Sequence, residues 1–456
     1  MAVPTVTGPI SGGTPDVPVN AMPTDLERQY GYSEREYFFS GIATAYKPSG
    51  TWGEDGKWGV APTTTAAYKS RMIVRTPTDP NRFNGTVVVE WLNETSGRDS
   101  DPDFGFAHLE LLRAGFAYVG VSAQALGITG QGGFKIPIPG YNPVSLRVQN
   151  PARYGTLSHP GDDYSYDIFS QAAQAIWRPK GSNPLGTLHP QRLIATGESQ
   201  SASRMVTYVN AIAPIANLYA GFMIHSRGND GTGIDSTSLA PTIAHIRPDI
   251  STPVMTIETE TDLFGLGFYS ARQPDTALLR TWEMAGTSHA DQSTLDYGVA
   301  SGHVWSPGEK APDFTALCGR INDGPETVVV SAAFAALNAW VTAGTPPAMA
   351  PPFEIAGGKI ARNARGNALG GIRTPAVDVP ISTLDGTLAP GKSVICSLFG
   401  STTPFDAATL ASLYPTHDGY VTRVRVAAAA AVAKTFLLPA DAATIAAQAQ
   451  AAPIPN

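Results

Sequence analysis

Residues 192–204 decide the fold, and they read Arg192-Leu193-Ile194-Ala195-Thr196-Gly197-Glu198-Ser199-Gln200-Ser201-Ala202-Ser203-Arg204. The apolar start of this stretch predicts a buried strand, and the residues from 202 onward predict a helix. Between them the chain consists of small and polar residues, with Ser199 at the apex of the expected turn. The stretch therefore predicts a strand that enters a helix through a sharp turn.

Ser199 has two interpretations. In a nucleophile elbow, a strand-to-helix turn exposes the serine hydroxyl, and the residues two before and two after it must be small because strand and helix nearly touch. Gly197 and Ser201 meet this demand, although the pattern is Gly-x-Ser-x-Ser rather than the commoner Gly-x-Ser-x-Gly. The alternative is a serine-rich N-cap that opens an ordinary helix.

Apolar strands alternate with helices on both sides of this stretch. Strands that are apolar on both faces and separated by helices are typical of a parallel sheet covered on both sides. We therefore predict an α/β fold with a mostly parallel central sheet, helices on both faces, and the first two strands antiparallel to the rest. The expected strands cover residues 36–46, 68–75, 86–92, 116–122, 193–196, 219–224, 254–257 and 279–284, and the expected helices cover residues 106–114, 164–177, 202–212 and 328–341.

The two ends of the chain differ in composition from its middle. Residues 1–30 are rich in Pro, Gly and Thr without periodicity, which predicts an extended arm on the surface. Residues 345–456 begin rich in Pro and Gly and end in two Ala-rich helices. Because they hold few periodic apolar segments, we predict an extension that wraps the core of a single domain spanning residues 1–456. The loop-like segments 125–160 and 226–252 are candidates for the walls or lid of a pocket.

The composition argues against several classes of partner. Hydrophobic residues make up 43% of the chain and charged residues 15%, which is typical of a globular protein. The formal net charge is −7, and no run of Lys or Arg offers a surface for nucleic acid or an anionic membrane. No apolar run reaches the roughly 18 residues that a membrane helix needs. We therefore expect no nucleic acid and no membrane span.

Metal and nucleotide chemistry lack a motif in this sequence. It holds two cysteines and neither a His-Glu-x-x-His nor a Cys-x-x-Cys spacing that would hold zinc. The glycines of residues 127–133 fit neither a Walker loop nor a dinucleotide fingerprint, and they predict a flexible loop. We expect neither a metal nor a cofactor, so side chains would have to activate a hydrolytic water.

Cys318 and Cys396 bear on the compartment of the protein. They can form a disulfide in an exported protein or remain two buried thiols in a cytosolic one, and we favour the disulfide. Residues 1–6 have neither the basic nor the apolar region of a signal peptide, but a mature chain would look the same. Localisation, secreted or cytoplasmic, and the oligomeric state stay open.

A nucleophilic serine needs a general base, and that base needs an orienting carboxylate. In an α/β sheet these partners follow the serine at the C-terminal ends of later strands, first the acid and then a histidine. His289 fits, because it follows the last expected strand through a short loop of small residues. His225 comes one strand too early and is expected to be structural or part of a pocket wall. His303 and His417 have no strand before them, and we expect them in solvated loops.

The acid is expected in the loop after the strand 254–257, where Glu258, Glu260 and Asp262 crowd the strand exit. We prefer Asp262, which sits where the loop should have turned inward. Glu260 is the rival, because alternation along an extended segment would point it to the same side. The other carboxylate would then support the site or be solvated.

A tetrahedral intermediate needs donors aimed at its oxyanion. One should be the backbone N–H of Gln200, at the N-terminus of a helix whose dipole favours negative charge. The other should come from the loop after the strand 86–92, as the N–H of Glu94 or Asn93. The His-Gly or Gly-Gly-Gly sequences often found there are absent.

The chain resembles the α/β-hydrolase superfamily, and within it the bacterial α/β-hydrolase-domain proteins with a Gly-Glu-Ser-Gln-Ser elbow. The resemblance spans residues 30–450 and implies a serine hydrolase that acts on carboxylic esters without a cofactor. Besides the elbow it rests on residues 87–93 and 115–124, His159-Pro160-Gly161-Asp162, Ile224-His225-Ser226-Arg227-Gly228, Glu260-Thr261-Asp262 and Trp282-Glu283-Met284-Ala285-Gly286-Thr287-Ser288-His289.

The hypothesis that follows is hydrolysis of a small-molecule ester through an acyl-enzyme intermediate. Ser199 attacks, His289 takes its proton, Asp262 orients the imidazole, and Gln200 with the loop at Asn93 and Glu94 stabilises the oxyanion. The alternatives are an acyltransferase that uses the same triad, a lactone or polyester hydrolase, and a non-catalytic binding protein on the same scaffold. The sequence does not identify the ester.

Overall fold

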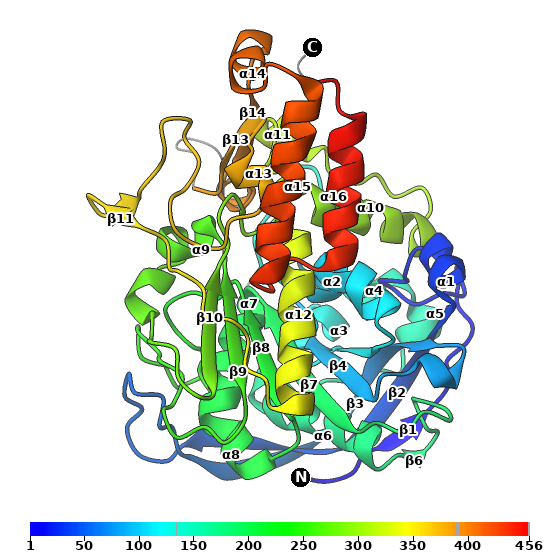
Figure 1. Cartoon of the computed structure of the whole chain (residues 1–456). Coiled ribbons are helices and arrows are strands. Elements are labelled where there is room, and N and C mark those ends of the chain that lie inside the picture. The colour runs from blue at the N-terminus through cyan, green and yellow to red at the C-terminus, as the bar shows by residue number, and fades with distance from the viewer. Residues whose placement is uncertain (134, 388–392, 455–456) are drawn as a thin grey trace. The chain divides into compact units, whose positions relative to one another are not determined.

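The structure is a computed structural model that describes residues 1–133, 135–387 and 393–454. Its residues group into two compact units. Unit 1 comprises Met1–Val254, Ser270–Gln273 and Asp296–Pro312, and unit 2 comprises Met255–Tyr269, Pro274–Leu295 and Asp313–Asn456. Each unit is described separately below, with the element labels of Figure 1.

Unit 1 is built on a sheet whose strands follow the order β8-β7-β4-β5-β3-β2-β1-β6. The strands β5, β4, β7 and β8 pair in parallel. Every residue of β4 and β5 is buried, which requires covering elements on both faces of the sheet. The strands are β1 (Thr5–Thr7), β2 (Tyr32–Pro48), β3 (Val60–Pro77), β4 (Thr86–Trp91), β5 (Ala117–Val121), β6 (Lys180–Gly181), β7 (Arg192–Glu198) and β8 (Gly221–His225).

The first two expected strands, β2 and β3, form a long antiparallel hairpin. As expected, β3 runs antiparallel to its sheet neighbour β5. The expectation was wrong for β2, because a second antiparallel pairing reverses the direction again and gives β2 the direction of β5. Both strands also extend well beyond the apolar residues from which they were predicted.

Helices of unit 1 pack on this sheet. α7 contacts β7 and β8, α2 contacts β7, and α6 contacts β2. The α-helices are α1 (Thr24–Tyr30), α2 (Pro102–Arg113), α3 (Ala125–Thr129), α4 (Leu146–Gln149), α5 (Pro151–Tyr154), α6 (Ser165–Trp177), α7 (Gln200–Thr207) and α8 (Ala213–Ala216). Two short 3₁₀ helices, η1 (Pro80–Arg82) and η2 (Asp162–Tyr164), and a π-helix, η3 (Tyr208–Ile212), accompany them.

The N-terminal arm expected over residues 1–30 is more ordered and more buried than its composition indicates. It contributes β1, which pairs with β2, and it ends in helix α1. Val6, Ala21 and Met22 are buried. Met22 donates its N–H to Glu34 Oε2 at 2.9 Å. This segment therefore packs into unit 1 along part of its length.

Unit 2 carries strands β9 (Val254–Glu258, from Met255 on) and β10 (Leu279–Glu283), and the C-terminal segment of the chain packs on β10. Trp282 packs edge-on against Phe436 with ring centroids 5.1 Å apart, and Phe353 donates its N–H to Glu283 Oε2 at 2.6 Å. The segment also has an apolar cluster of its own around Tyr414 and Val424. The expected lack of apolar segments there was therefore wrong.

The remaining elements of unit 2 are mostly helical. The two expected Ala-rich helices are present as α15 and α16, which lie side by side (Figure 1). The elements are α9 (Glu260–Gly265), α11 (Phe314–Cys318), α12 (Glu326–Ala343), α13 (Pro375–Asp378), α14 (Ala407–Leu413), α15 (His417–Ala433), α16 (Pro439–Ala451), η5 (Val394–Leu398) and the strand pairs β11 (Ile355–Ala356) with β12 (Lys359–Ile360) and β13 (Ser382–Asp385) with β14 (Ser401–Pro404). Besides β9, two elements include residues of both units, η4 (Phe268–Ala271) and α10 (Gln292–Trp305).

Helix α12 is the one helix among the described residues that is long and apolar enough to cross a membrane. Half of this helix is buried within the structure, and Phe334 and Leu337 are fully buried. The expectation concerned uninterrupted apolar runs, and α12 does not contradict it, because Glu326, Ser331 and Asn338 interrupt its apolar residues. Since the core helix of a globular protein has the same composition, α12 is weak evidence for a membrane span.

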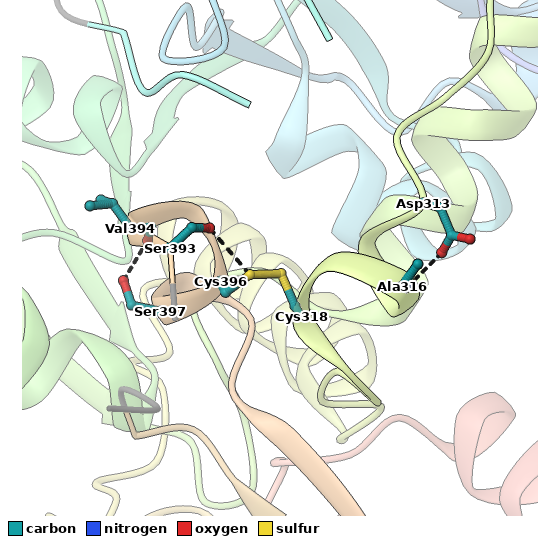
Figure 2. Close-up of a disulfide and its surroundings, with 7 residues drawn as sticks. All are labelled: Asp313, Ala316, Cys318, Ser393, Val394, Cys396 and Ser397. Carbon is teal, nitrogen blue, oxygen red and sulfur yellow. Dashed lines mark hydrogen bonds between the residues drawn. A yellow bond between two sulfur atoms is a disulfide. The ribbon is translucent and has the colours of Figure 1, made fainter. Parts of the chain in front are cut away.

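Cys318 and Cys396 form a disulfide that joins α11 to η5 (Figure 2). Asp313 caps α11 by accepting the N–H of Ala316 at 2.8 Å, and Ser393 Oγ lies 3.4 Å from Cys396 Sγ (Figure 2). The favoured alternative for the two cysteines is therefore confirmed. The bond closes a loop with a sequence separation of 78 residues.

We expect removal of this disulfide to destabilise the protein, because a long closed loop restricts the unfolded chain. Replacing both Cys318 and Cys396 by Ser should lower the free energy of unfolding by about 2–4 kcal/mol. Urea unfolding without reductant measures the difference. The double variant should not respond to dithiothreitol, whereas the wild type should. Identical midpoints for the wild type with and without reductant would contradict the prediction.

Candidate active site

Ser199 occupies the sharp turn between β7 and α7. Its backbone is at φ 59° and ψ −119°, a left-handed region that a non-glycine residue rarely adopts. The Ser199 N–H donates to His225 O at 2.9 Å, and the Ser199 carbonyl accepts the N–H of Ser203 at 3.2 Å. Hydrogen bonds to β8 and within the first turn of the helix thus hold the strained conformation.

The residues that flank this turn have no room to be larger. A Cβ added to Gly197 would lie 2.8 Å from the carbonyl oxygen of Ser201. Ser201 is itself fully buried, and its hydroxyl has no hydrogen-bond partner among the described residues. The crowding expected from the sequence is therefore present, and Ser201 fills the second small position.

In unit 2, Asp262 and His289 form a buried pair. His289 Nδ1 lies 2.6 Å from Asp262 Oδ1. The second carboxylate oxygen, Oδ2, accepts hydrogen bonds from the N–H and the hydroxyl of Thr259, both at 2.7 Å. Burial acts to raise the pKa of Asp262, but His289 and the bonds from Thr259 outweigh it and lower this pKa below its ordinary value. The carboxylate therefore stays ionised beside the imidazole.

Glu260, the rival acid, is occupied elsewhere. Its Oε1 accepts the N–H of Gly286 at 2.7 Å, and its Oε2 accepts Arg362 Nη2 at 2.7 Å and the N–H of Gly386 at 3.2 Å. Burial raises the pKa of Glu260, and the charge of Arg362 opposes that rise. Glu260 therefore binds the loop before His289 together with the C-terminal segment.

The expectation that Glu260 and Asp262 point to the same side was wrong, because the segment is not extended. Alternation holds for an extended segment, but residues Glu260–Gly265 form helix α9. Thr259 is the N-cap of this helix, and Asp262 at its third position completes a capping box with it. On a helix, residues two apart point in different directions.

The loop that carries His289 is tied down on several sides. The His289 N–H donates to Thr261 Oγ1 at 3.1 Å, and the N–H of Ala290 donates to Leu398 O at 3.0 Å. Ser288 Oγ donates to Phe399 O at 3.1 Å. Leu398 belongs to η5, the element that also contains the disulfide-bonded Cys396. The C-terminal segment thereby supports the position of the imidazole.

The three expected oxyanion donors differ in whether their N–H groups already donate a hydrogen bond within the protein. The Asn93 N–H already donates to Ser100 O at 2.9 Å. No described residue accepts the Glu94 N–H. Gln200 is the first residue of α7, where backbone N–H groups have no partner within the helix. The N–H groups of Glu94 and Gln200 are thus better placed than that of Asn93 to receive an oxyanion.

Glu94 also has a buried side chain. Its oxygens accept Gln124 Nε2 at 2.7 Å and the N–H of Gly127 at 3.0 Å. Burial and the nearby charge of Asp162 raise the pKa of Glu94 to about 8, and Arg204 opposes part of that rise. The carboxyl group is therefore mostly protonated at neutral pH.

Beside Gln200, unit 1 contains a cavity of about 520 Å³. Both segments predicted as pocket walls contribute to it, the first through residues 125, 131–133 and 159–160 and the second through residues 232, 233, 235 and 236. Arg204 also lines it and donates from Nη2 to Asp162 Oδ2 at 2.9 Å. Sequence reasoning missed this ion pair. The stretch His159-Pro160-Gly161-Asp162 had been noted without a role, and nothing in the sequence pairs Asp162 with a helix residue beyond the elbow.

The other histidines agree only in part with expectation. His225 is fully buried, and its Nδ1 lies 2.8 Å from Asp103 Oδ1, as expected of a structural histidine. Asp103 was not foreseen. His303 and His417 were expected in loops, but they lie in helices α10 and α15.

No group of three or more His, Cys, Asp or Glu residues that could hold a metal ion occurs in the described part of the chain. Asp162, Glu260 and Asp262 are paired with Arg204, Arg362 and His289, and Glu94 accepts hydrogen bonds from Gln124 and Gly127. These acids therefore already have hydrogen-bond partners within the protein.

Comparison with known proteins gives the family. A family model described as an alpha/beta hydrolase domain matches residues 6–447. No curated protein matches the chain.

Similar solved structures include three distant hydrolases. The first is a cold-adapted esterase from an Arctic intertidal metagenomic library, with 14% identity, 59% of this chain and 93% of that chain covered, and a TM-score of 0.30. The second is an α/β serine hydrolase from Xanthomonas campestris, with 12% identity, coverage of 59% and 97%, and a TM-score of 0.28. The third is a glucuronoyl esterase from Solibacter usitatus, with 8% identity, coverage of 56% and 76%, and a TM-score of 0.29. Likeness at this distance carries no argument about substrate.

The raised pKa of Glu94 predicts a pH-dependent stability. The folded protein keeps this proton up to about pH 8, whereas an unfolded chain with the ordinary value of 4.5 releases it earlier. Because the folded state then binds more protons, the Glu94 contribution to stability is present below pH 4.5 and is lost as the pH rises to about 8. Glu94→Gln, which cannot ionise, should escape this loss.

The difference in Tm between Glu94→Gln and the wild type should therefore rise from pH 5 to pH 8.5, by on the order of a few degrees. Glu309→Gln is the matched control. Burial acts to raise the pKa of Glu309, but bonds from Ser306 and the charge of Arg98 lower it, so its Tm difference should be flat over this range. A flat difference for Glu94→Gln would show that Glu94 is ionised throughout.

Proposed function

Because the chain belongs to the alpha/beta hydrolase domain family, we propose that it is a serine hydrolase that cleaves carboxylic esters through an acyl-enzyme intermediate. The observation that carries the proposal is the positive φ of Ser199 at a crowded strand-to-helix turn. Such strain persists where the surrounding structure maintains it, and it is typical of functional sites. Ser199 is also only partly buried, so a substrate can reach it.

In the proposed first step, Ser199 Oγ attacks the carbonyl carbon of the ester while its proton passes to His289 Nε2. The Nδ1 side of the same imidazole faces the ionised Asp262, which stabilises the positive charge and holds the tautomer. The carbonyl oxygen becomes an oxyanion, for which the N–H groups of Gln200 and Glu94 are the proposed donors. When the carbonyl re-forms, the ester C–O bond breaks and the alcohol leaves with the proton from His289.

The second step returns the enzyme to its starting state. Water attacks the acyl carbon, and His289 takes a proton from it. The bond to Ser199 Oγ then breaks, the serine recovers its proton, and the carboxylic acid is released. The proposal requires no metal or cofactor, and it requires that His289 Nε2 reach Ser199 Oγ in the working enzyme.

Replacing Ser199 by Ala should remove hydrolysis of p-nitrophenyl acetate, lowering kcat by on the order of 10⁴-fold or more. Ser201→Ala is the matched control, because it makes the same chemical change two residues away and removes a hydroxyl that has no partner among the described residues. It should keep the activity and the Tm of the wild type. A Ser199→Ala protein that retains a tenth of the activity would overturn the proposal.

Neutral variants of Asp262 and Glu260 should differ in whether activity or stability is lost. Asp262→Asn should lower kcat by about 10³- to 10⁴-fold with little change in Tm, because the amide no longer stabilises the protonated imidazole. Glu260→Gln should mainly lower Tm, because Arg362 loses a buried partner. Steady-state kinetics and thermal unfolding of both variants test this. The reverse pattern would transfer the role of triad acid to Glu260.

A further inference from the structure

The cavity beside Gln200, here called the Arg204 pocket, has walls suited to a polar ligand. Its volume of about 520 Å³ accommodates a group larger than an acetyl or methyl substituent. Among the described residues that line it, only Ala125 and Pro160 have a purely hydrocarbon side chain. No described lining residue has a large aliphatic side chain, and the one aromatic ring among them is the polar imidazole of His159. This lining offers little to a long acyl chain, whose binding depends on apolar contact.

Charge excludes an acidic ligand. The positive Arg204 and the negative Asp162 form an ion pair, so that their charges offset each other. Asp163 and Asp235 add two carboxylates to the lining. Burial lowers the pKa of His159 below its ordinary value, although the charge of Asp162 opposes this shift, so the ring is mostly neutral at pH 7. The walls therefore carry net negative charge, which repels a carboxylate or phosphate.

Hydrogen-bonding capacity distinguishes the two remaining classes of ligand, those with an ammonium group and those with hydroxyl groups. The lining offers hydrogen-bond donors as well as acceptors. Gln131 and Arg204 carry N–H groups, and Asp163 and Asp235 carry carboxylate oxygens. A ligand that both donates and accepts can therefore use more of this lining than one that only donates. An ammonium group can only donate, whereas a hydroxyl both donates and accepts.

Two carboxylates in the wall of the pocket, Asp163 and Asp235, also suit a ligand with hydroxyl groups. Asp235 Oδ1 accepts the N–H of Ser238 at 2.6 Å and that of Thr237 at 2.8 Å, which fixes the carboxylate in a turn. Asp163 Oδ1 accepts the N–H of Ser236 at 2.7 Å. Hydrogen bonds from backbone thus hold two carboxylates in the wall without neutralising them. Fixed carboxylates are strong acceptors for hydroxyl groups.

We propose that the Arg204 pocket binds the polyhydroxylated part of a neutral ester, such as the ester of a sugar or polyol. The inference rests on the proposed function, because it assigns the substrate class of the same site. Gln200 links the two, because its N–H is a proposed oxyanion donor and the residue also lines the pocket. A hydroxylated group held there would lie next to the residue that follows Ser199.

Three acetate esters of comparable size test the class: 6-O-acetylglucose, hexyl acetate and acetylcholine. The wild type should hydrolyse the glucose ester with a kcat/KM at least about tenfold above that of the other two, since a pocket built for hydroxyls disfavours analogues that lack them. A preference for hexyl acetate would overturn the proposal in favour of an apolar site. A preference for acetylcholine would overturn it in favour of a cation site.

Asp235→Asn keeps the turn but removes the charge, and it should lower the ratio of glucose ester to hexyl ester severalfold. Arg204→Gln should lower it further, and Asp235→Asn remains the test if that protein does not fold. Asp249→Asn, at an exposed ion pair with Arg247 away from the pocket, is the control and should keep the ratio. A ratio that is unchanged in Asp235→Asn would overturn the proposal.

A binding measurement separates this inference from the proposed chemistry. Calorimetric titration of 6-O-acetylglucose into Ser199→Ala protein needs no catalysis. Saturable binding that Asp235→Asn weakens would support the pocket even if no ester is hydrolysed. Absence of heat with the glucose ester would overturn the pocket assignment, even if simple esters are hydrolysed at Ser199.

Discussion

The close approach of β7 and α7 at Ser199 is the constraint on which the rest of unit 1 depends. A Cβ at Gly197 would collide with the backbone of Ser201, so the strand can turn into the helix only with small residues on both sides. Ser199 accepts an unfavourable φ as a consequence. Hydrogen bonds from the turn to β8 and to Ser203 maintain it. The parallel strands β4, β7 and β8 supply the rigid frame that makes such a turn sustainable.

Hydrogen-bond partners, more than position in the sequence, give each buried carboxylate its role. Asp262 is kept ionised by His289 and by the cap of α9, so it can face an imidazole that gains a proton. Glu260, two residues earlier, instead receives backbone N–H groups and Arg362 and fastens the loop before His289. Glu94 has no charged partner at bonding distance, and burial leaves it largely protonated. Asp262 thus faces the imidazole as an ionised group, Glu260 holds two segments together, and Glu94 accepts hydrogen bonds as a largely neutral carboxyl group.

Much of the fold could be predicted because β4, β5 and β7 contain apolar runs without polar alternation, as in strands of a sheet that is covered on both faces. Ser199 was singled out by the strand-turn-helix pattern, and Asp262 was preferred because it sits where the loop after residues 254–257 should have turned inward. What could not be predicted depended on local geometry or on distant partners. Helix α9 begins at Glu260, which invalidates alternation, and the pairing of Arg204 with Asp162 joins segments that no motif relates. The bridge between Asn93 and Ser100 likewise decides which N–H groups are free.

The central claim is that Ser199 is a nucleophile activated within this fold. Labelling of the native protein with a fluorophosphonate probe, followed by intact-mass analysis and peptide mapping, tests it most directly, because the probe reacts with an activated serine whatever the natural ester is. The account predicts a single adduct on Ser199, absent from heat-denatured protein and from Ser199→Ala. No adduct on the folded protein, or an adduct on another serine, would contradict it.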